Sequence, residues 1–149
     1  MIYIDTSVIV KLYLKETYSI EAATWIKKNN QAILLTRLHD LEFINAINLK
    51  QFRNEITDGQ VRYILAKFDK HQQQGIFYRP PFNWTEILKI AVDLIQSHTK
   101  HIGSRSLDIL HVAAALSIKA DRFLTFDDRQ IRLAGLAGLE IVHVDKVSR

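Results

Sequence analysis

The feature of this sequence that most restricts its fold is a regular alternation of short apolar segments with longer segments of helical periodicity. The short segments are rich in β-branched and aromatic residues, which favour strands. The segments between them carry apolar residues three and four positions apart, which is typical of helices. This alternation predicts an α/β fold, a three-layer α/β/α sandwich with a mainly parallel central sheet. The predicted strands are residues 2–4, 32–36, 76–79, 122–125 and 139–144, and the predicted helices are residues 6–12, 18–30, 37–54, 57–74, 84–98, 106–120 and 128–137, with a loop at 98–104.

The length and composition fit one globular domain that needs no disulfide. A chain of 149 residues can bury a substantial core, so we expect a single domain over residues 1–149. Cysteine is absent, which excludes disulfides, thiolate metal ligands and cysteine nucleophiles and fits a reducing compartment. The longest nearly apolar stretch, residues 109–118, is too short to span a bilayer, and the amino-terminus has no signal-peptide pattern. We therefore expect a cytoplasmic protein with no membrane partner.

The charge of the chain is mildly basic and unevenly distributed. Lysine plus arginine number 20 against 16 acidic residues, which gives a net charge of +4. Two explanations of the basic residues in the helices predicted at 37–54 and 57–74 stay open: an ordinary solvated helix face, or a surface that binds nucleic acid. These residues are Lys50, Arg53, Arg62, Lys67, Lys70 and His71.

Two aspartates follow apolar strands. Asp5 interrupts the apolar stretch IYIDTSVIV, where Thr6 and Ser7 are suited to starting a helix, and Asp127 follows the strand that ends at Thr125. If the two strands are parallel, both carboxylates lie at the carboxyl edge of the sheet, where α/β proteins bind ligands. The alternative is that each aspartate caps the helix that follows it, a role that Asp128 could also take.

A third aspartate lies in a helix that is apolar almost all round. The segment SLDILHVAAALSIKA carries Asp108 and His111 in its first turns. A buried carboxylate must be protonated, paired with a cation or bound to a metal ion. Arg105 is a plausible salt-bridge partner, and the helix dipole also favours an acidic residue at this end. We interpret His111 as a hydrogen-bonded core residue rather than a catalytic base.

Glu42 is the fourth acidic residue in an unexpected position. With Asn45 it shares a helical stripe whose other members are apolar, so a solvated glutamate is not expected there. The stripe consists of Leu38, Glu42, Asn45, Leu49 and Phe52.

One shared site explains four such carboxylates more simply than four separate coincidences. Two carboxylates about 5 Å apart repel by roughly 3 kcal/mol at an effective dielectric constant of 20, and a divalent cation removes that cost. Without cysteine, and without a histidine pair at zinc-binding spacing, the ligands are oxygens, which favours Mg²⁺ or Mn²⁺. Such ions activate water and stabilise the leaving oxygen in phosphodiester cleavage, so we expect metal-dependent hydrolysis.

Other catalytic classes fit less well. A haloacid-dehalogenase-like phosphatase needs a second aspartate two residues after the first, where this chain has Ser7. The phosphate-binding Gly-x-x-x-x-Gly-Lys-Ser/Thr motif is absent. The remaining histidines are interpreted as loop or surface residues: His39, His71, His98, His101 and His143.

The order of motifs resembles the PIN-domain nucleases, in particular the VapC-like toxins of type II toxin–antitoxin pairs. The resemblance covers essentially the whole chain and depends on YIDTSVIVKLYL, LEFINAI, RSLDILHVAAAL and FLTFDDRQIRLA. It implies an acidic catalytic and metal-binding site at Asp5, Glu42, Asp108 and Asp127, because Asp127 and not Asp128 occupies the family's Thr-x-Asp position. Supporting roles would fall on Thr6, Ser7, Asn45 and Thr125.

The resemblance also implies an activity and partners. It predicts an Mg²⁺- or Mn²⁺-dependent endoribonuclease that acts on RNA as a toxin, forms a homodimer and binds a cognate antitoxin. The alternative is a PIN-fold module that binds nucleic acid or takes part in assembly without catalysis. Retention of all four acidic residues favours the enzyme, because a binding module has no reason to bury uncompensated charge.

Overall fold

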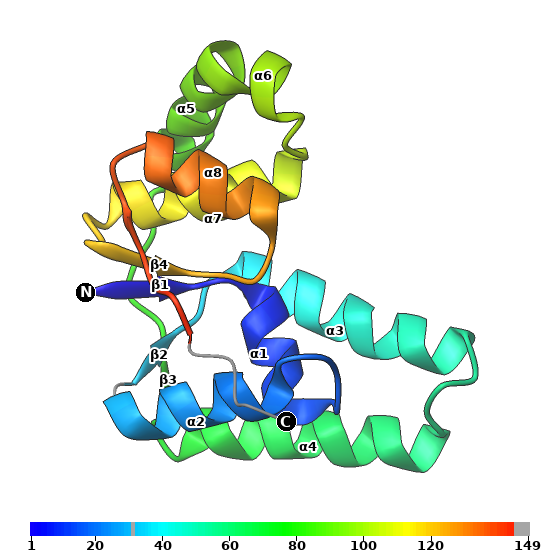
Figure 1. Ribbon diagram of the computed structural model, residues 1–149. Coiled ribbons are helices and arrows are strands. Elements are labelled where there is room, and N and C mark those ends of the chain that lie inside the picture. The colour runs from blue at the N-terminus through cyan, green and yellow to red at the C-terminus, as the bar shows by residue number, and fades with distance from the viewer. Residues whose placement is uncertain (31, 145–149) are drawn as a thin grey trace. The chain divides into compact units, whose positions relative to one another are not determined.

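A computed structural model describes residues 1–30 and 32–144 (Figure 1). The chain forms two compact units, each built from its own set of elements. The first unit comprises residues Met1–Val8 and Pro81–Val144, and the second comprises Ile9–Pro80. Helix α1 (Thr6–Tyr13) begins in the first unit and ends in the second. The described strands are all paired in parallel, which confirms the predicted α/β class.

The first unit contains a three-stranded parallel sheet in the order β1-β4-β5. Strand β1 (Ile2–Ile4) pairs with β4 (Arg122–Leu124), which in turn pairs with β5 (Glu140–Ile141). Tyr3 lies opposite Phe123, and their fully buried rings stack with centroids 5.6 Å apart. This aromatic pair fixes the register of β1 against β4, because a slip of β1 by one residue would turn the Tyr3 ring to the other face of the sheet and separate it from Phe123.

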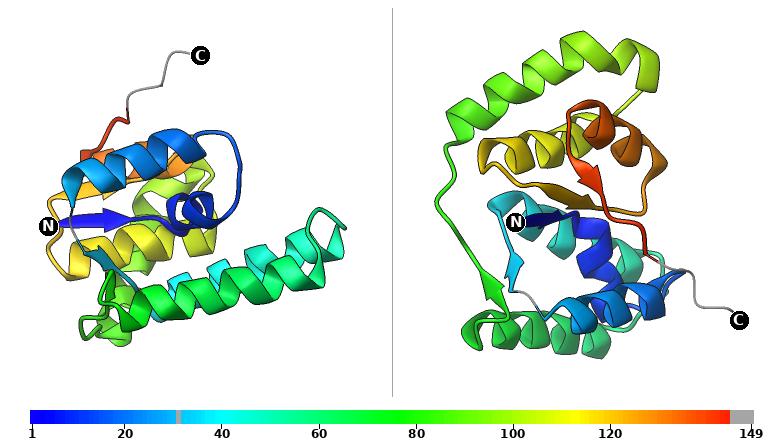
Figure 2. Two further views of the ribbon diagram at one scale, coloured as in Figure 1. Left: turned by 90° about the horizontal axis from the view of Figure 1, so that it is seen from below. Right: turned by 60° about the vertical axis from the view of Figure 1, so that its left-hand side comes forward.

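Helices cover this sheet along its length (Figures 1 and 2). The apolar helix α7 (Ser106–Ser117) packs against α5 (Trp84–Leu94) and α8 (Asp128–Leu136). The run of residues 112–115 in α7 is fully buried, which explains why this helix is apolar on nearly every side. None of the helices in residues 1–30 and 32–144 has the length and hydropathy needed to cross a membrane.

The loop predicted at 98–104 is wrong for residues 98–102, which are helical, and is confirmed only for residues 103 and 104. The chain continues beyond α5 as a π-helical segment, η1 (Ile95–Thr99), and a short helix, α6 (Lys100–Ile102). No proline or glycine interrupts the backbone hydrogen bonds until Gly103, which has a φ of 70°. Glycine adopts this left-handed conformation without a steric penalty, so the helical path ends there.

The second unit is mainly helical. A two-stranded parallel sheet joins β2 (Ile33–Leu34) and β3 (Phe77–Tyr78). The helices are α2 (Ser19–Asn29), α3 (Arg37–Phe52) and α4 (Asp58–Gln73), of which α3 and α4 lie side by side (Figure 2). Phe43 of α3 stacks on Phe68 of α4 with ring centroids 4.2 Å apart, and both are buried. This stacked pair joins the two long helices.

The apolar stripe predicted on α3 is also wrong at its carboxyl-terminal end, where its residues are not buried. The buried face of the helix contains Leu38, Phe43 and Ile47, whereas Leu49 is 39% exposed and Phe52 is 83% exposed. The helical period alone cannot choose between the two apolar stripes of α3, because both satisfy it. Packing against Phe68 selects the stripe through Phe43.

Candidate functional site

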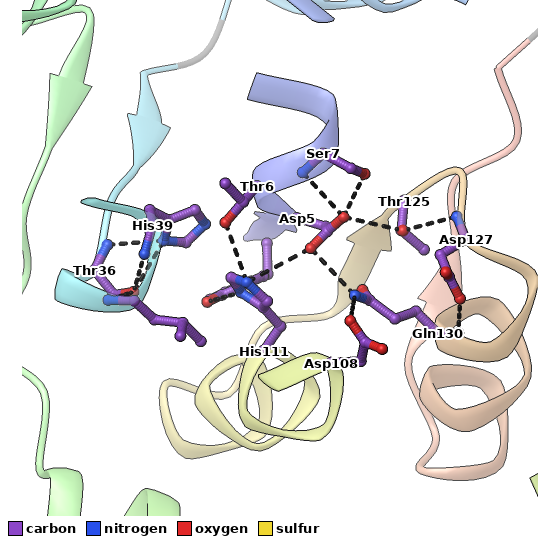
Figure 3. A network of polar contacts seen from close by, with 12 residues as sticks. Asp5, Thr6, Ser7, Thr36, His39, Asp108, His111, Thr125, Asp127 and Gln130 are labelled. Atoms are coloured by element: carbon purple, nitrogen blue, oxygen red, sulfur yellow. Dashed lines mark hydrogen bonds and ion pairs between the residues drawn. The ribbon is translucent and has the colours of Figure 1, made fainter. Parts of the chain in front are cut away.

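Asp5 lies directly after β1, at the carboxyl edge of the three-stranded sheet (Figure 3). Its backbone N–H donates to the carbonyl of Leu124 at 2.9 Å, so the β1–β4 pairing holds the residue in place. Its side chain is buried and accepts hydrogen bonds from the N–H of Ser7 at 3.2 Å, from the Ser7 hydroxyl, and from the Thr125 hydroxyl at 3.3 Å. Asp5 therefore does contact the first turn of α1 as a cap would, but it also accepts a hydrogen bond from Thr125, directly after β4.

Asp108 lies in the first turn of α7 and is only 7% exposed. The Nε of Arg105 donates to its Oδ2 at 3.0 Å, which confirms the predicted salt bridge. The arginine side chain is 71% exposed, so solvent screens the ion pair. This pair leaves the second carboxylate oxygen, Oδ1, to bond elsewhere.

Gln130 connects the two aspartates (Figure 3). Its Nε2 lies 3.2 Å from Oδ1 of Asp5 and 3.1 Å from Oδ1 of Asp108. The structure thus brings two of the predicted carboxylates to a single amide group, although they are distant in the sequence. Gln130 was not among the site residues predicted from the sequence. The available signal was its position three residues after Asp127, on the buried face of α8.

Asp127 is placed at this edge by its backbone and caps α8 with its side chain. Its N–H donates to the Thr125 hydroxyl at 3.1 Å, and that hydroxyl in turn donates to Asp5. Its carboxylate accepts from the N–H groups of Arg129 at 2.8 Å and Gln130 at 3.0 Å. The capping alternative is therefore confirmed for Asp127, while the neighbouring Asp128 is exposed. A metal-binding role for Asp127 stays a prediction.

Two substitutions at Asp127 separate capping from charge. Asp127→Ala should lower the free energy of unfolding by about 1 kcal/mol, because the first turn of α8 loses its acceptor. Asp127→Asn should change it by only a few tenths of a kcal/mol, since asparagine caps about as well as aspartate. Urea denaturation of both variants beside Asp128→Ala provides the measurement. Equal losses for all three substitutions would contradict the assigned cap.

His111 is a hydrogen-bonded core residue, as predicted. Its ring is fully buried, with Nδ1 2.9 Å from the hydroxyl of Tyr3 and Nε2 3.1 Å from Oγ1 of Thr6. The same Nε2 lies 3.6 Å from Oδ1 of Asp5. The Thr6 hydroxyl thus lies against the imidazole, and α1 begins at Thr6, as predicted. Through His111, α7 is tied to β1 beside the aspartate.

Glu42 and Asn45 lie on α3 in the second unit. Glu42 is half-buried and Asn45 is exposed. Their assignment to the acidic site stays a prediction.

At the start of the same helix, His39 is fully buried and is not a surface residue as predicted. Its Nδ1 accepts a hydrogen bond from the N–H of Thr36 at 2.9 Å, and the Thr36 hydroxyl accepts one from the N–H of His39. The imidazole thus replaces the usual Glu or Gln of a capping box.

The basic residues of α3 and α4 are not equally available to an anion. Lys50 forms ion pairs with Glu16 at 3.4 Å and Glu55 at 2.6 Å, which raise the pKa of the lysine. Burial, followed by repulsion from Lys67 and Lys70, lowers the pKa of His71 and so favours the neutral form of its ring. Lys50 is therefore already paired with acidic residues, and the positive charge of His71 is disfavoured. The other four are exposed, one directly after α3 and three on α4: Arg53, Arg62, Lys67 and Lys70.

The groups around Asp5 fit a hard divalent cation. The carboxylates of Asp5 and Asp108 and the hydroxyl of Thr125 are oxygen donors, which Mg²⁺ and Mn²⁺ prefer. The carboxylates of Asp5 and Asp108 repel each other, and the Gln130 amide and the Arg105 side chain offset part of that repulsion. A cation would neutralise the pair more completely. Chemically, this arrangement suits metal-assisted hydrolysis.

Together, the parallel sheets, the helices around them and the acidic residues at the carboxyl edge of β1 define an α/β protein with an oxygen-rich site. A model of the PIN domain family matches residues 2–136, so the chain belongs to the PIN domain family. This confirms the resemblance inferred from the sequence motifs.

The fold is also found in a solved structure. The crystal structure of FitAcB from Neisseria gonorrhoeae matches with a TM-score of 0.63 and 16% sequence identity, covering 96% of this chain and 97% of that chain. At this identity the match supports the fold alone. A comparison with curated proteins found no significant match.

Proposed function

We propose that this protein is a metal-dependent endoribonuclease and the toxin component of a toxin–antitoxin pair. Membership in the PIN family supports a nuclease activity in general. The observation that carries the proposal is the convergence of the buried carboxylates of Asp5 and Asp108 on one amide group. A pure binding module has no need to bury two acidic groups so close together.

The proposed metal-binding and catalytic residues are Asp5, Glu42, Asp108 and Asp127. A bound Mg²⁺ or Mn²⁺ would activate water and stabilise the leaving oxygen of an RNA phosphodiester. Ser7 and Thr125 hold the Asp5 carboxylate in one orientation by donating hydrogen bonds to it. Thr6 acts indirectly, by fixing His111 beside Asp5. Asn45 is proposed as a neighbouring polar contact.

Metal binding predicts a gain in thermal stability. A ligand that binds only the folded state stabilises it by about 2.7 kcal/mol at roughly 100 times its Kd. Differential scanning fluorimetry with MgCl₂ or MnCl₂, and with KCl at matched ionic strength as the control, should therefore give a higher Tm with the divalent salts. If the melting curves coincide, no preformed cation site exists.

Cleavage is tested directly on RNA. The purified protein should cut total RNA in the presence of Mn²⁺, and cleavage should stop when EDTA is added. Sequencing of the new RNA ends would identify the target. Binding of RNA without cleavage under these conditions would favour the alternative, a non-catalytic PIN module.

The remaining proposals concern assembly and location. We propose a single PIN-like domain, a cytoplasmic location and a cognate antitoxin, as the family resemblance implies. A homodimer is supported by the outer face of α5 and the start of η1, where Leu88, Val92 and Ile95 follow at helical spacing and are 54%, 51% and 39% exposed. A monomeric mass in light-scattering measurements would contradict the dimer.

A further inference from the structure

Gln130 is a polar residue of this site to which neither the sequence prediction nor the proposed mechanism gives a role. It lies in the first turns of α8 and is 2% exposed. Its amide group points between Asp5 and Asp108 (Figure 3) and bonds to both carboxylates through the same nitrogen. A side chain that is buried between two acidic groups of different elements is in a position to control their separation.

The chemistry of the neighbours fixes the orientation of the amide. Ionised carboxylates only accept hydrogen bonds, so the group that faces them must be the NH₂, with one proton for each aspartate. The other end of the amide, Oε1, is buried and has no hydrogen-bond partner among residues 1–30 and 32–144. Buried polar atoms in proteins are nearly always satisfied, and an exception calls for an explanation such as an ion or a water molecule.

We propose that Gln130 is part of the cation site itself. Without a cation, its NH₂ group holds the carboxylates of Asp5 and Asp108 together, and with a cation, its Oε1 turns to become one of the surrounding oxygen ligands. Rotation of the amide replaces its NH₂ group, a hydrogen-bond donor that suits two carboxylates, with Oε1, an oxygen that suits a cation bound between them. The inference rests on the proposed function, because it requires that Asp5 and Asp108 bind a cation.

Two substitutions test the role of the amide. Gln130→Met keeps the length of the side chain but removes the amide, and Gln130→Glu keeps an oxygen at the same place. Gln96→Met makes the same chemical change at an exposed position of η1 and serves as the control. The affinity of each purified protein for Mn²⁺ is measured by isothermal titration calorimetry.

We expect Gln130→Met to bind Mn²⁺ about 10- to 100-fold more weakly than the wild type, the range found when a group supporting a metal site is removed. Gln130→Glu should bind at least as tightly as the wild type, and Gln96→Met should be unchanged. Wild-type affinity in Gln130→Met would overturn the inference while leaving the metal site intact. Failure of the wild type itself to bind Mn²⁺ would instead overturn the proposed metal site, and this inference with it.

A second measurement applies even if Gln130→Met does not fold. In the wild-type protein, the side-chain NH₂ signals of Gln130 are followed by NMR during titration with Mg²⁺, and their assignment comes from their loss in Gln130→Glu. Both signals should shift as the hydrogen bonds to the aspartates break. Signals that stay in place while backbone signals of Asp5 and Asp108 shift would overturn the inference.

Discussion

Asp5→Asn is expected to reduce RNA cleavage by at least about a hundredfold, as loss of a key electrostatic group does in other active sites. The carboxylate lies at the carboxyl edge of the sheet and accepts hydrogen bonds from Ser7, Thr125 and Gln130. Asparagine has nearly the same shape as aspartate but no charge, so the site loses its attraction for a cation. Its NH₂ group would also face hydrogen-bond donors, so part of the hydrogen bonding is lost. The cleavage rate with Mn²⁺ on total RNA is the measurement, and relief of growth arrest on expression is its cellular counterpart.

The matched control for this substitution is Asp93→Asn, which removes one carboxylate from an exposed position of α5. It should retain wild-type cleavage. Circular dichroism must show that Asp5→Asn is folded at the assay temperature, because its altered hydrogen bonds also lower stability. A folded Asp5→Asn protein with wild-type cleavage and toxicity would refute catalysis at this site.

His111→Ala is expected to lower the free energy of unfolding by about 3 kcal/mol, because it leaves a cavity in the core beside α7 and removes the hydrogen-bond partner of two buried hydroxyl groups. The imidazole is fully buried and bonds to the Tyr3 hydroxyl and the Thr6 hydroxyl. A change of this size is a large fraction of the stability of a domain. Urea unfolding followed by tryptophan fluorescence measures it.

His101→Ala provides the comparison, since His101 is exposed, and it should alter stability by less than about 0.5 kcal/mol. The pair of variants also separates two roles for His111. If His111→Ala unfolds at the wild-type urea concentration but has lost cleavage, the histidine takes part in the reaction itself and is not mainly a core residue.

Several features could be predicted because they depend on residues close in sequence or on the direction of the strands. The position of Asp5 followed from the apolar residues before it and the helix after it. The placement of Asp127 at the same edge required only that β1 and β4 be parallel, which the β–α alternation indicates. The salt bridge between Arg105 and Asp108 is a contact within one helical turn, so its spacing revealed it.

Other features could not be predicted, because they depend on which of several permitted surfaces becomes buried. Both apolar stripes of α3 satisfy the helical period, and only packing of Phe43 on Phe68 decides between them. His39 looked like a surface residue, yet the extended backbone at Thr36 brings its ring into a cap. The helical path through residues 98–102 gave no periodic signal of its own and ends at Gly103.

The sequence by itself therefore determined the α/β class, the parallel strand direction and the acidic residues at the strand ends, because periodicity and local hydrogen bonding act over a few residues. Only the tertiary structure decided that Gln130 lies between Asp5 and Asp108. A glutamine in an ordinary helix carries no sign of what it will face. Its partners are Asp5, directly after β1, and Asp108 in α7. These residues are far apart in the sequence, and they meet only because α7 packs against α8.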